Sequence, residues 1–359
     1  MNRGFQQEEW QSVQGASDVS APVLPRFNWL EVVFWGAALA SVLVLPCYYL
    51  ILNAIAILGL FALSLDLILG FAGIVSLGHT AFLGTGAYAA GLLAKHGTGD
   101  PLTGLVFAGL VSGVLGWLTS FLVLRGSDLT RLMVTLGVAL VMYEAANSLA
   151  WLTGGADGLQ GMTVGPILGL FSFDLMGRTG FIYSLTVLFV LFLLARRIMR
   201  SSFGLSLRAI KANPLRAAAV GVPVHRRLIA IYTLAAVYAG IAGALLAQTT
   251  QFVSLDFLDF QRSADVLLVL IIGGAGYLYG GLIGAILFKF MQDWLANLTP
   301  QYWLFWIGLI LVVFTLVGRE RLTGGIAGAI ARLSARNRTT SSEPVRGRKA
   351  APSSGQGAA

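Results

Sequence analysis

One apolar stretch of the chain, residues 63–93, is interrupted in a way that a simple membrane anchor is not. The interruption consists of small and polar residues, namely Gly70, Gly73, Ser76, Gly78 and His79. An unsatisfied backbone group in lipid costs several kcal/mol, so such residues are tolerated at that depth mainly where protein or water covers them. The stretch therefore predicts a broken helix that forms a hinge or a cavity wall, an arrangement typical of transporters.

The composition identifies the class of protein. Of the 359 residues, 57% are hydrophobic and 11% are charged, and the mean hydropathy is +0.79, whereas a soluble domain has roughly 25% charged residues. We therefore expect an all-α polytopic membrane protein. The only cysteine is Cys47, and the three histidines form no Cys/His cluster, so we expect neither a disulfide nor a metal site.

Eight apolar runs are long enough to cross about 30 Å of hydrocarbon. They lie at about residues 29–46, 49–69, 79–94, 103–124, 132–152, 181–195, 228–247 and 302–317. A ninth region, residues 264–295, is too long for one ordinary span. It is interrupted by a glycine cluster that consists of Gly273, Gly274, Gly276, Gly280, Gly281 and Gly284.

The basic residues predict the orientation of these spans. Segment 196–227 has eight basic residues and no acid, and the tail from Arg319 has eight basic residues against two acids. By the positive-inside rule both segments lie in the cytoplasm. A single crossing by residues 264–295 would put the tail outside, so we expect two short crossings or an out-and-back excursion that meet near the glycine cluster. About ten crossings result, within a range of eight to ten, and both termini are cytoplasmic.

Three parts of the chain follow from this arrangement. Residues 1–28 form a polar cytoplasmic segment whose mixed charge does not fit a cleavable signal peptide. Residues 29–318 form the transmembrane domain, which includes the cytoplasmic loop 196–227. Residues 319–359 form a basic cytoplasmic tail, with a composition that predicts disorder from about residue 337. The basic segments lie beside spans and lack interleaved aromatic residues, so we expect no nucleic-acid partner.

The long cytoplasmic loop contains the pattern of a short helix with a signal at each end. Asn213 is a good N-cap, Pro214 fits the first helical position, and three alanines follow. Gly221 suits the left-handed C-terminal position and Pro223 prevents continuation. A two-turn helix is marginal alone in water, so it needs a partner surface. It either ties two spans together or is a docking site for a cytoplasmic protein that moves it.

Ionisable residues within the spans are few, namely Asp66, Glu144, Asp265 and Lys289. Only Asp66 is expected deep in a span, because the other three lie near predicted span ends where they reach water. We expect His79 to cap or bond backbone groups freed at the break rather than to carry protons. The chain lacks the phosphate-loop pattern G-x-x-x-x-G-K-[ST], so nucleotide energy has to come from another subunit.

Several motifs resemble the M-type permease subunit of branched-chain amino acid ABC importers. They are SLGHTAFLGTGAY at 76–88, LTGGADGL at 152–159, GLSLRAIK at 204–211 and GIAGAL at 240–245, in the family's order, and the likeness covers about residues 29–317. The resemblance implies an inner-membrane permease that pairs with a second, H-type permease, two cytoplasmic ATPases and a periplasmic solute-binding protein. This chain would bind no cofactor, since ATP and magnesium belong to the ATPases.

The resemblance also implies roles for residues of the loop and of the helix breaks. The ATPase coupling element would comprise Arg208, Lys211, Asn213, Pro214, Arg216, Ala217, Ala218, Ala219 and Gly221. The breaks that line the solute route would comprise Asp66, Gly70, Gly73, Ser76, Gly78 and His79 in the first half, and Gly273, Gly274 and Gly276 in the second.

The solute and the mode of transport are open to alternatives. The expected solutes are leucine, isoleucine and valine, but the same family includes permeases for urea and short amides. A stand-alone secondary transporter would need buried groups that couple an ion, and the spans offer little besides Asp66 and Ser64. An intramembrane enzyme lacks paired carboxylates, a Ser/His pair or metal ligands at workable spacing, so no catalytic residue is expected.

Overall fold

A computed structural model of the chain describes residues 29–44, 48–97, 99–166, 169, 174, 177–298, 300–302 and 305–309. The expected N-terminal segment 1–28, the tail 319–359 and most of the closing span 302–317 lie outside the described residues. The chain divides into two compact units, Met1–Trp294 and Leu295–Ala359. The helix packing and the candidate site belong to the first unit.

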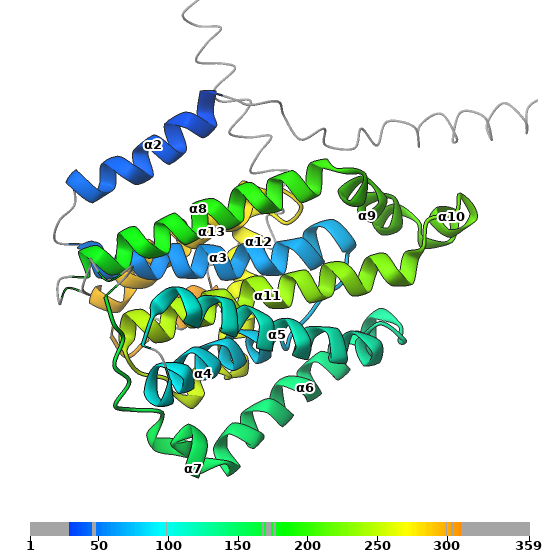
Figure 1. The fold of residues 1–359 in the computed structure, drawn as a ribbon. Coiled ribbons are helices and arrows are strands. Elements are labelled where there is room, and N and C mark those ends of the chain that lie inside the picture. Colours follow the sequence, from blue (N-terminus) through cyan, green and yellow to red (C-terminus); the bar gives the residue numbers. More distant parts are fainter. Residues whose placement is uncertain are drawn as a thin grey trace, which may run out of the picture. The chain divides into compact units, whose positions relative to one another are not determined.

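The described part of the chain is helical, and within it the one β-type contact is an isolated bridge between Leu159 and Val253. The α-helices are α2 (Trp29–Val44), α3 (Tyr49–Ala72), α4 (Thr80–His96), α5 (Pro101–Val123), α6 (Asp128–Ser148), α7 (Ala150–Thr153), α8 (Arg178–Arg200), α9 (Ser202–Ala212), α10 (Pro214–Ala219), α11 (Val224–Thr250), α12 (Phe260–Gly273) and α13 (Leu278–Leu298). Two short 3-10 helices are η2 (Gly155–Asp157) and η3 (Leu255–Phe257), and residues 305–309 are also helical. The expected all-α fold is confirmed (Figure 1).

Five of these helices, α3, α5, α6, α8 and α11, are long and apolar enough to cross a membrane. Helices α12 and α13 form a bent pair. If this pair is counted as one span, the described residues contain six candidate spans. The chain is therefore a multi-pass membrane protein. The expected count of about ten crossings is not confirmed and stays a prediction, because α2 and α4 are shorter, with 16 and 17 residues.

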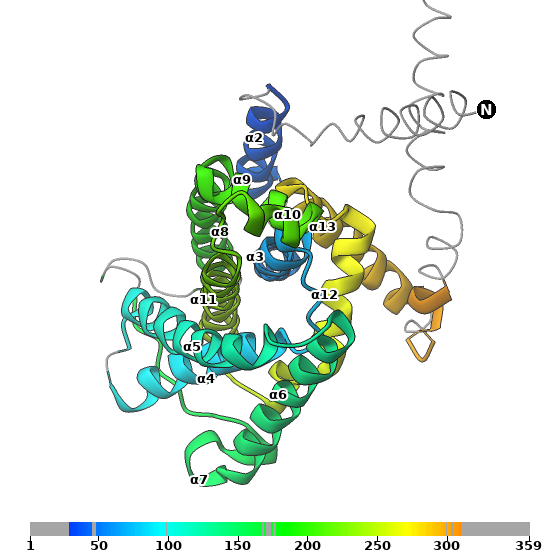
Figure 2. The same ribbon diagram turned by 90° about the vertical axis from the view of Figure 1, so that its right-hand side faces the viewer.

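Helix α3 is the centre of the first unit. It is apolar on all sides, and its side chains from Ile55 to Ala72 are almost all buried, as expected for a helix that neighbours surround. Figure 2 shows α3 between α8 and α11 on one side and α12 on the other. The cytoplasmic end of α8, in the predicted orientation, also holds α2, through a buried ion pair between Arg196 and Glu31.

Small residues allow α4, α5 and α11 to approach closely. A Cβ atom at Gly86 of α4 would overlap the backbone of Gly240 in α11, and one at Gly240 would overlap Ser112 of α5. A Cβ atom at Gly243 would overlap the Leu83 carbonyl group. Close backbone approach at small residues is the usual way in which membrane helices gain packing energy, so these glycines serve helix packing.

The glycine cluster of the ninth region is where α12 ends and α13 begins, and the two helices are bent by 112° to each other. Helix α13 returns along α3, because Gly276 lies beside Gly70 whereas Leu282 lies beside Gly59. The sequence therefore correctly located the interruption of this region. The return of the chain along α3 is the geometry expected for an out-and-back excursion.

We expect Gly243→Ala to lower the thermal melting temperature of the purified protein, because the added methyl group meets backbone atoms of α4. Overpacking of this kind costs about 1–3 kcal/mol. The matched control is Gly137→Ala in α6, where a Cβ atom would have no neighbour within 4 Å and alanine favours the helix. Melting in detergent, followed by gel filtration after heating, measures both. Equal melting temperatures for the two variants would contradict the proposed packing role.

Candidate functional site

The first helix break lies between α3 and α4 and comprises residues 73–79. Gly73 ends α3 in the left-handed conformation, with φ 75°, and its amide donates to the Leu69 carbonyl at 3.2 Å. The amide of Ile74 donates to the Ile68 carbonyl at 3.1 Å, so both bonds satisfy carbonyl groups of the last helical turn. At Gly78 the chain passes so close to the Thr135 carbonyl of α6 that a side chain would not fit.

His79 lies at the end of this break and is fully buried. Its Nε2 atom is 2.8 Å from the Ser64 hydroxyl of α3, and its ring stacks on Phe61 with centroids 5.5 Å apart. Its side chain makes no capping hydrogen bond to the start of α4. The expectation that His79 bonds freed backbone groups is therefore wrong. Ser64, on the neighbouring helix, offers a hydroxyl partner that sequence spacing did not reveal.

Helix α4 begins inside the protein rather than at its surface. The amide of Thr80 donates to the Ser263 hydroxyl at 3.1 Å, and the two hydroxyl oxygens lie 2.9 Å apart. Ser263 belongs to the first turns of α12, so α12 supplies a partner for one of the amides that a helix start leaves unpaired. The first break is thus held on one side by α3 and on the other by α12.

Asp66 joins the last turns of α3 to the second break. This residue is fully buried in α3, as expected, and its Oδ1 atom accepts a hydrogen bond of 2.7 Å from the Gly276 amide between α12 and α13. A Cβ atom at Gly70 would overlap Asp66 Oδ1 and would also lie within 2.5 Å of the Gly276 nitrogen. Asp66, Gly70 and Gly276, which the sequence grouped as parts of one route, therefore lie in direct contact.

The basic loop contacts the same end of α3. Lys211 of α9 donates from Nζ to the Gly70 carbonyl at 2.6 Å, and its stem lies against Gly73. Arg208, one turn earlier, lies over the Phe71 ring, with 5.7 Å from its guanidinium carbon to the ring centroid. Two residues expected to face an ATPase thus hold the loop to the last turn of α3.

The capped loop helix forms as the sequence predicts. The Asn213 side chain accepts from the Arg216 amide at 3.0 Å, Pro214 occupies the first position, and Gly221 has a φ of 92°. The helix, α10, packs on α9 and α11. Figure 1 shows α9 and α10 together beside the ends of α8 and α11.

Only one face of α10 is used in this packing. Ala217 is buried, whereas Ala218 and Ala219 are exposed. Leu215 is 81% exposed and Val220 is 85% exposed. Large apolar side chains on a loop are a feature of interaction surfaces, and the sequence analysis did not single out these two.

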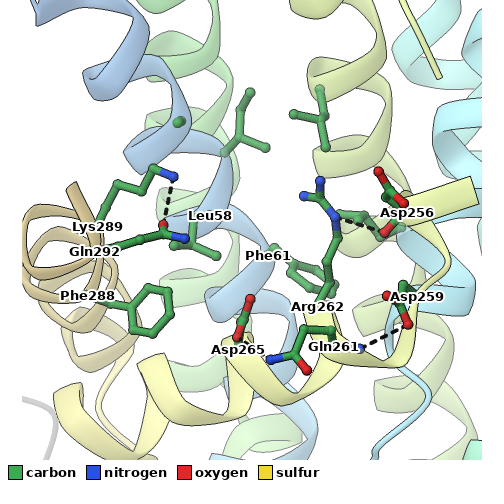
Figure 3. A pocket seen from close by; sticks show the side chains of 14 residues that line it. Leu58, Phe61, Asp256, Asp259, Gln261, Arg262, Asp265, Phe288, Lys289 and Gln292 are labelled. Atoms are coloured by element: carbon green, nitrogen blue, oxygen red, sulfur yellow. Dashed lines mark hydrogen bonds between the residues drawn. The ribbon is translucent and has the colours of Figure 1, made fainter. Parts of the chain in front are cut away.

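A charged cavity of about 370 Å³ lies near the other end of α3, where the predicted orientation puts the outside. Its polar lining consists of Asp256, Asp259, Gln261, Arg262, Asp265, Lys289 and Gln292. Its apolar lining consists of Ala54, Ile57, Leu58, Phe61, Leu83, Leu246 and Phe288. Figure 3 shows Lys289 and Gln292 on one side, Arg262 on the other, and Phe61 between them.

The sequence analysis assigned Asp265 and Lys289 to span ends and gave them no role. The spacing of Asp259, Arg262 and Asp265 at intervals of three residues was a usable signal, because residues three apart share a helix face. Lys289 joins them only because α13 turns back along α3. This contact over a bend could not be read from spacing.

Comparisons with known proteins give a family. The family described as "Branched-chain amino acid transport system / permease component" matches residues 48–315. The high-affinity branched-chain amino acid transport system permease protein LivM of Salmonella typhimurium is 27% identical over 275 residues, and LivM of Escherichia coli K12 is 26% identical over the same length. Each match covers 71% of this chain and 64% of the relative, so the chain spans less than two thirds of these relatives.

A relative with a different name matches over a larger share of this chain and of its own length than the LivM proteins do. The autoinducer 2 import system permease protein LsrD of Escherichia coli K12 is 26% identical over 308 residues, which are 81% of this chain and 89% of the relative. No solved structure matches.

We expect Lys211→Met to loosen α9 from α3, because the Gly70 carbonyl then loses its donor. A hydrogen bond to a charged group contributes roughly 1.5–3 kcal/mol. Loss of about 1.5 kcal/mol of local stability raises the rate of amide hydrogen exchange in α9 about tenfold. Hydrogen–deuterium exchange measured by mass spectrometry follows this change. Arg226→Met, which removes an exposed cation of the same loop, is the control. Unchanged protection of α9 in the Lys211 variant would show that the bond does not hold the loop.

Proposed function

This chain belongs to the branched-chain amino acid transport system permease family, and we propose that it is the permease subunit of an ATP-driven importer for leucine, isoleucine and valine. The LivM relatives are named as permease proteins of a high-affinity branched-chain amino acid transport system, which supports this proposal. The protein is a multi-pass membrane protein of a transport family. The proposed importer places it in the bacterial inner membrane with both termini in the cytoplasm.

The observation that carries the proposal is the shape of the basic loop. Helix α10 has only six residues, so it is not stable alone, yet it is capped at Asn213 and projects Leu215 and Val220 into the surroundings. A partner protein that packs on these side chains would bury them and stabilise the helix. Since this sequence has no phosphate loop, the proposed partner is an ATPase subunit, which alone binds ATP and magnesium.

The contacts of the loop suggest how ATPase motion reaches the membrane domain. Lys211 and Arg208 fix α9 to the end of α3, and Asp66 of α3 holds the second break at Gly276. A rigid-body displacement of the loop therefore acts on both breaks together. In this proposal the nine loop residues from Arg208 to Gly221 named above transmit force, and the residues of the two breaks form the gate.

The remaining partners follow from the proposed importer. A related second permease subunit completes the membrane part, two ATPases bind on the cytoplasmic side, and a solute-binding protein delivers solute from the periplasm. In this assembly the chain itself catalyses no reaction. The LsrD relative is named for a different solute, so a related permease for another solute, such as urea or a short amide, is the alternative.

Reconstitution tests the proposed function directly. The chain is inserted into liposomes with and without the proposed second permease, two ATPases and binding protein, and uptake of labelled leucine and urea is measured. We expect leucine uptake that requires ATP and every partner. Uptake by this chain alone, insensitive to ATP depletion, would instead identify a secondary transporter. ATP-dependent uptake of urea without leucine would identify the alternative solute.

We predict that Ala218→Asp and Leu215→Asp lower substrate-stimulated ATP hydrolysis of the assembled complex at least tenfold, because each places a charge in the exposed face of α10. An unpaired charge buried at an interface costs several kcal/mol. His225→Asp is the control, since it adds the same charge at the start of α11, where the helix dipole favours an acid. Native ATP hydrolysis in both α10 variants, with the complex still assembled, would remove the coupling role from this helix.

A further inference from the structure

We propose that the charged cavity between α3, α12 and α13 binds the zwitterionic backbone of an amino acid after the binding protein releases it. This inference rests on the proposed function and adds a site of selectivity within the permease. The cavity has both signs of charge at its rim and apolar side chains behind them. Its volume of about 370 Å³ is at the small end of the range of ligand pockets.

The cations are placed to take a carboxylate. Arg262 is oriented by two contacts: its Nε atom donates to the Asp256 carbonyl at 2.9 Å, and its guanidinium carbon lies 5.0 Å from the Phe257 ring centroid. These contacts leave the terminal nitrogens for a fork-like pair of bonds to a carboxylate. Lys289, on the opposite side, donates to Gln292 at 2.8 Å and has further donors.

Neither cation makes a direct ion pair at the cavity, although aspartates lie near both. Arg262 interacts electrostatically with Asp256, Asp259 and Asp265, and Lys289 interacts with Asp265 and Asp293. In the described residues, ion pairs within 4.0 Å join Arg131 to Asp128 and Arg196 to Glu31, and neither pair involves the cavity. Figure 3 shows Lys289 and Arg262 projecting toward the space from different helices. Both side chains are partly buried, and each offers N–H donors to a carboxylate group that enters the cavity.

Acidic groups at the same rim suit the ammonium group. Asp265 accepts from the Gln261 side chain at 3.3 Å, and Asp259 caps α12 by accepting from the Gln261 amide at 3.3 Å. Each carboxylate uses one oxygen in these bonds and keeps acceptor capacity in the other. The rim therefore offers both signs of charge at once, which match the two charged groups of a zwitterion, whereas urea and a neutral sugar have no charged groups to match.

The apolar wall suits a branched aliphatic side chain. Ile57, Leu58 and Phe61 of α3 line the cavity with Leu83 of α4 and Phe288 of α13. Phe61 also stacks on His79 at the first break, so the apolar wall is continuous with the broken segment. A solute that leaves the cavity inward therefore meets the proposed gate.

The test uses the reconstituted complex with saturating, leucine-loaded binding protein. Leucine taken up per ATP hydrolysed is expected to fall about tenfold or more in Lys289→Gln and Asp265→Asn, because each loses a charge-assisted bond to the solute. Lys289→Arg, which keeps the charge, is expected to restore most of the ratio. Asp157→Asn is the matched control, because Asp157 is exposed and does not line the cavity. Native ratios in Lys289→Gln and Asp265→Asn would overturn the inference.

A binding measurement separates this inference from the proposed function. Calorimetry on the purified permease pair in nanodiscs is carried out with leucine, with 4-methylpentanoate, which lacks the ammonium group, and with urea. We expect that leucine binds weakly, that 4-methylpentanoate and urea do not bind, and that Lys289→Gln abolishes the binding of leucine. If the complex does not import leucine yet leucine binds in this Lys289-dependent way, the proposed function fails and the cavity inference stands. If the complex imports leucine but the three solutes bind equally or not at all, the inference fails and the function stands.

Discussion

The fold depends on how the backbone groups freed at two helix breaks find partners away from water. Inside an apolar environment an unpaired amide or carbonyl is strongly unfavourable, so a break can lie only where another element supplies a donor or an acceptor. Asp66 accepts from the Gly276 amide, and Lys211 donates to the Gly70 carbonyl. These two bonds bring the basic loop and the glycine cluster between α12 and α13 to the same end of α3.

This requirement changes how the buried carboxyl group of Asp66 is understood. An ionisable residue within a span is by default a functional candidate, and the sequence analysis placed Asp66 on the solute route. Its contact with Gly276 shows that it also has a structural task, since it holds a break that would otherwise expose an unpaired amide. The two roles are compatible, because a bond that holds a break closed is also one that has to change when the break moves.

Features that depend on local sequence could be predicted, and features that depend on tertiary contact could not. The cap at Asn213, the turn at Gly221 and the interruption at Gly273 each follow from the conformational preferences of one or two residues. By contrast, the Ser64 partner of His79 and the position of Lys289 depend on which helices become neighbours. The number of crossings depends in addition on how α12 and α13 divide one long apolar region.

Helix α3 connects the two ends of the proposed mechanism. Its Ala54–Phe61 segment lines the charged cavity, and its last turn holds the loop through Gly70. The helix has 24 residues and therefore extends about 36 Å at 1.5 Å per residue. It is continuous over that length and almost fully buried from Ile55 onward, so in the proposed mechanism it transmits a displacement rather than absorbing it. Because α13 carries Lys289 and begins beside Gly276, which is bonded to α3, the proposed shift of the loop would move both walls of the cavity.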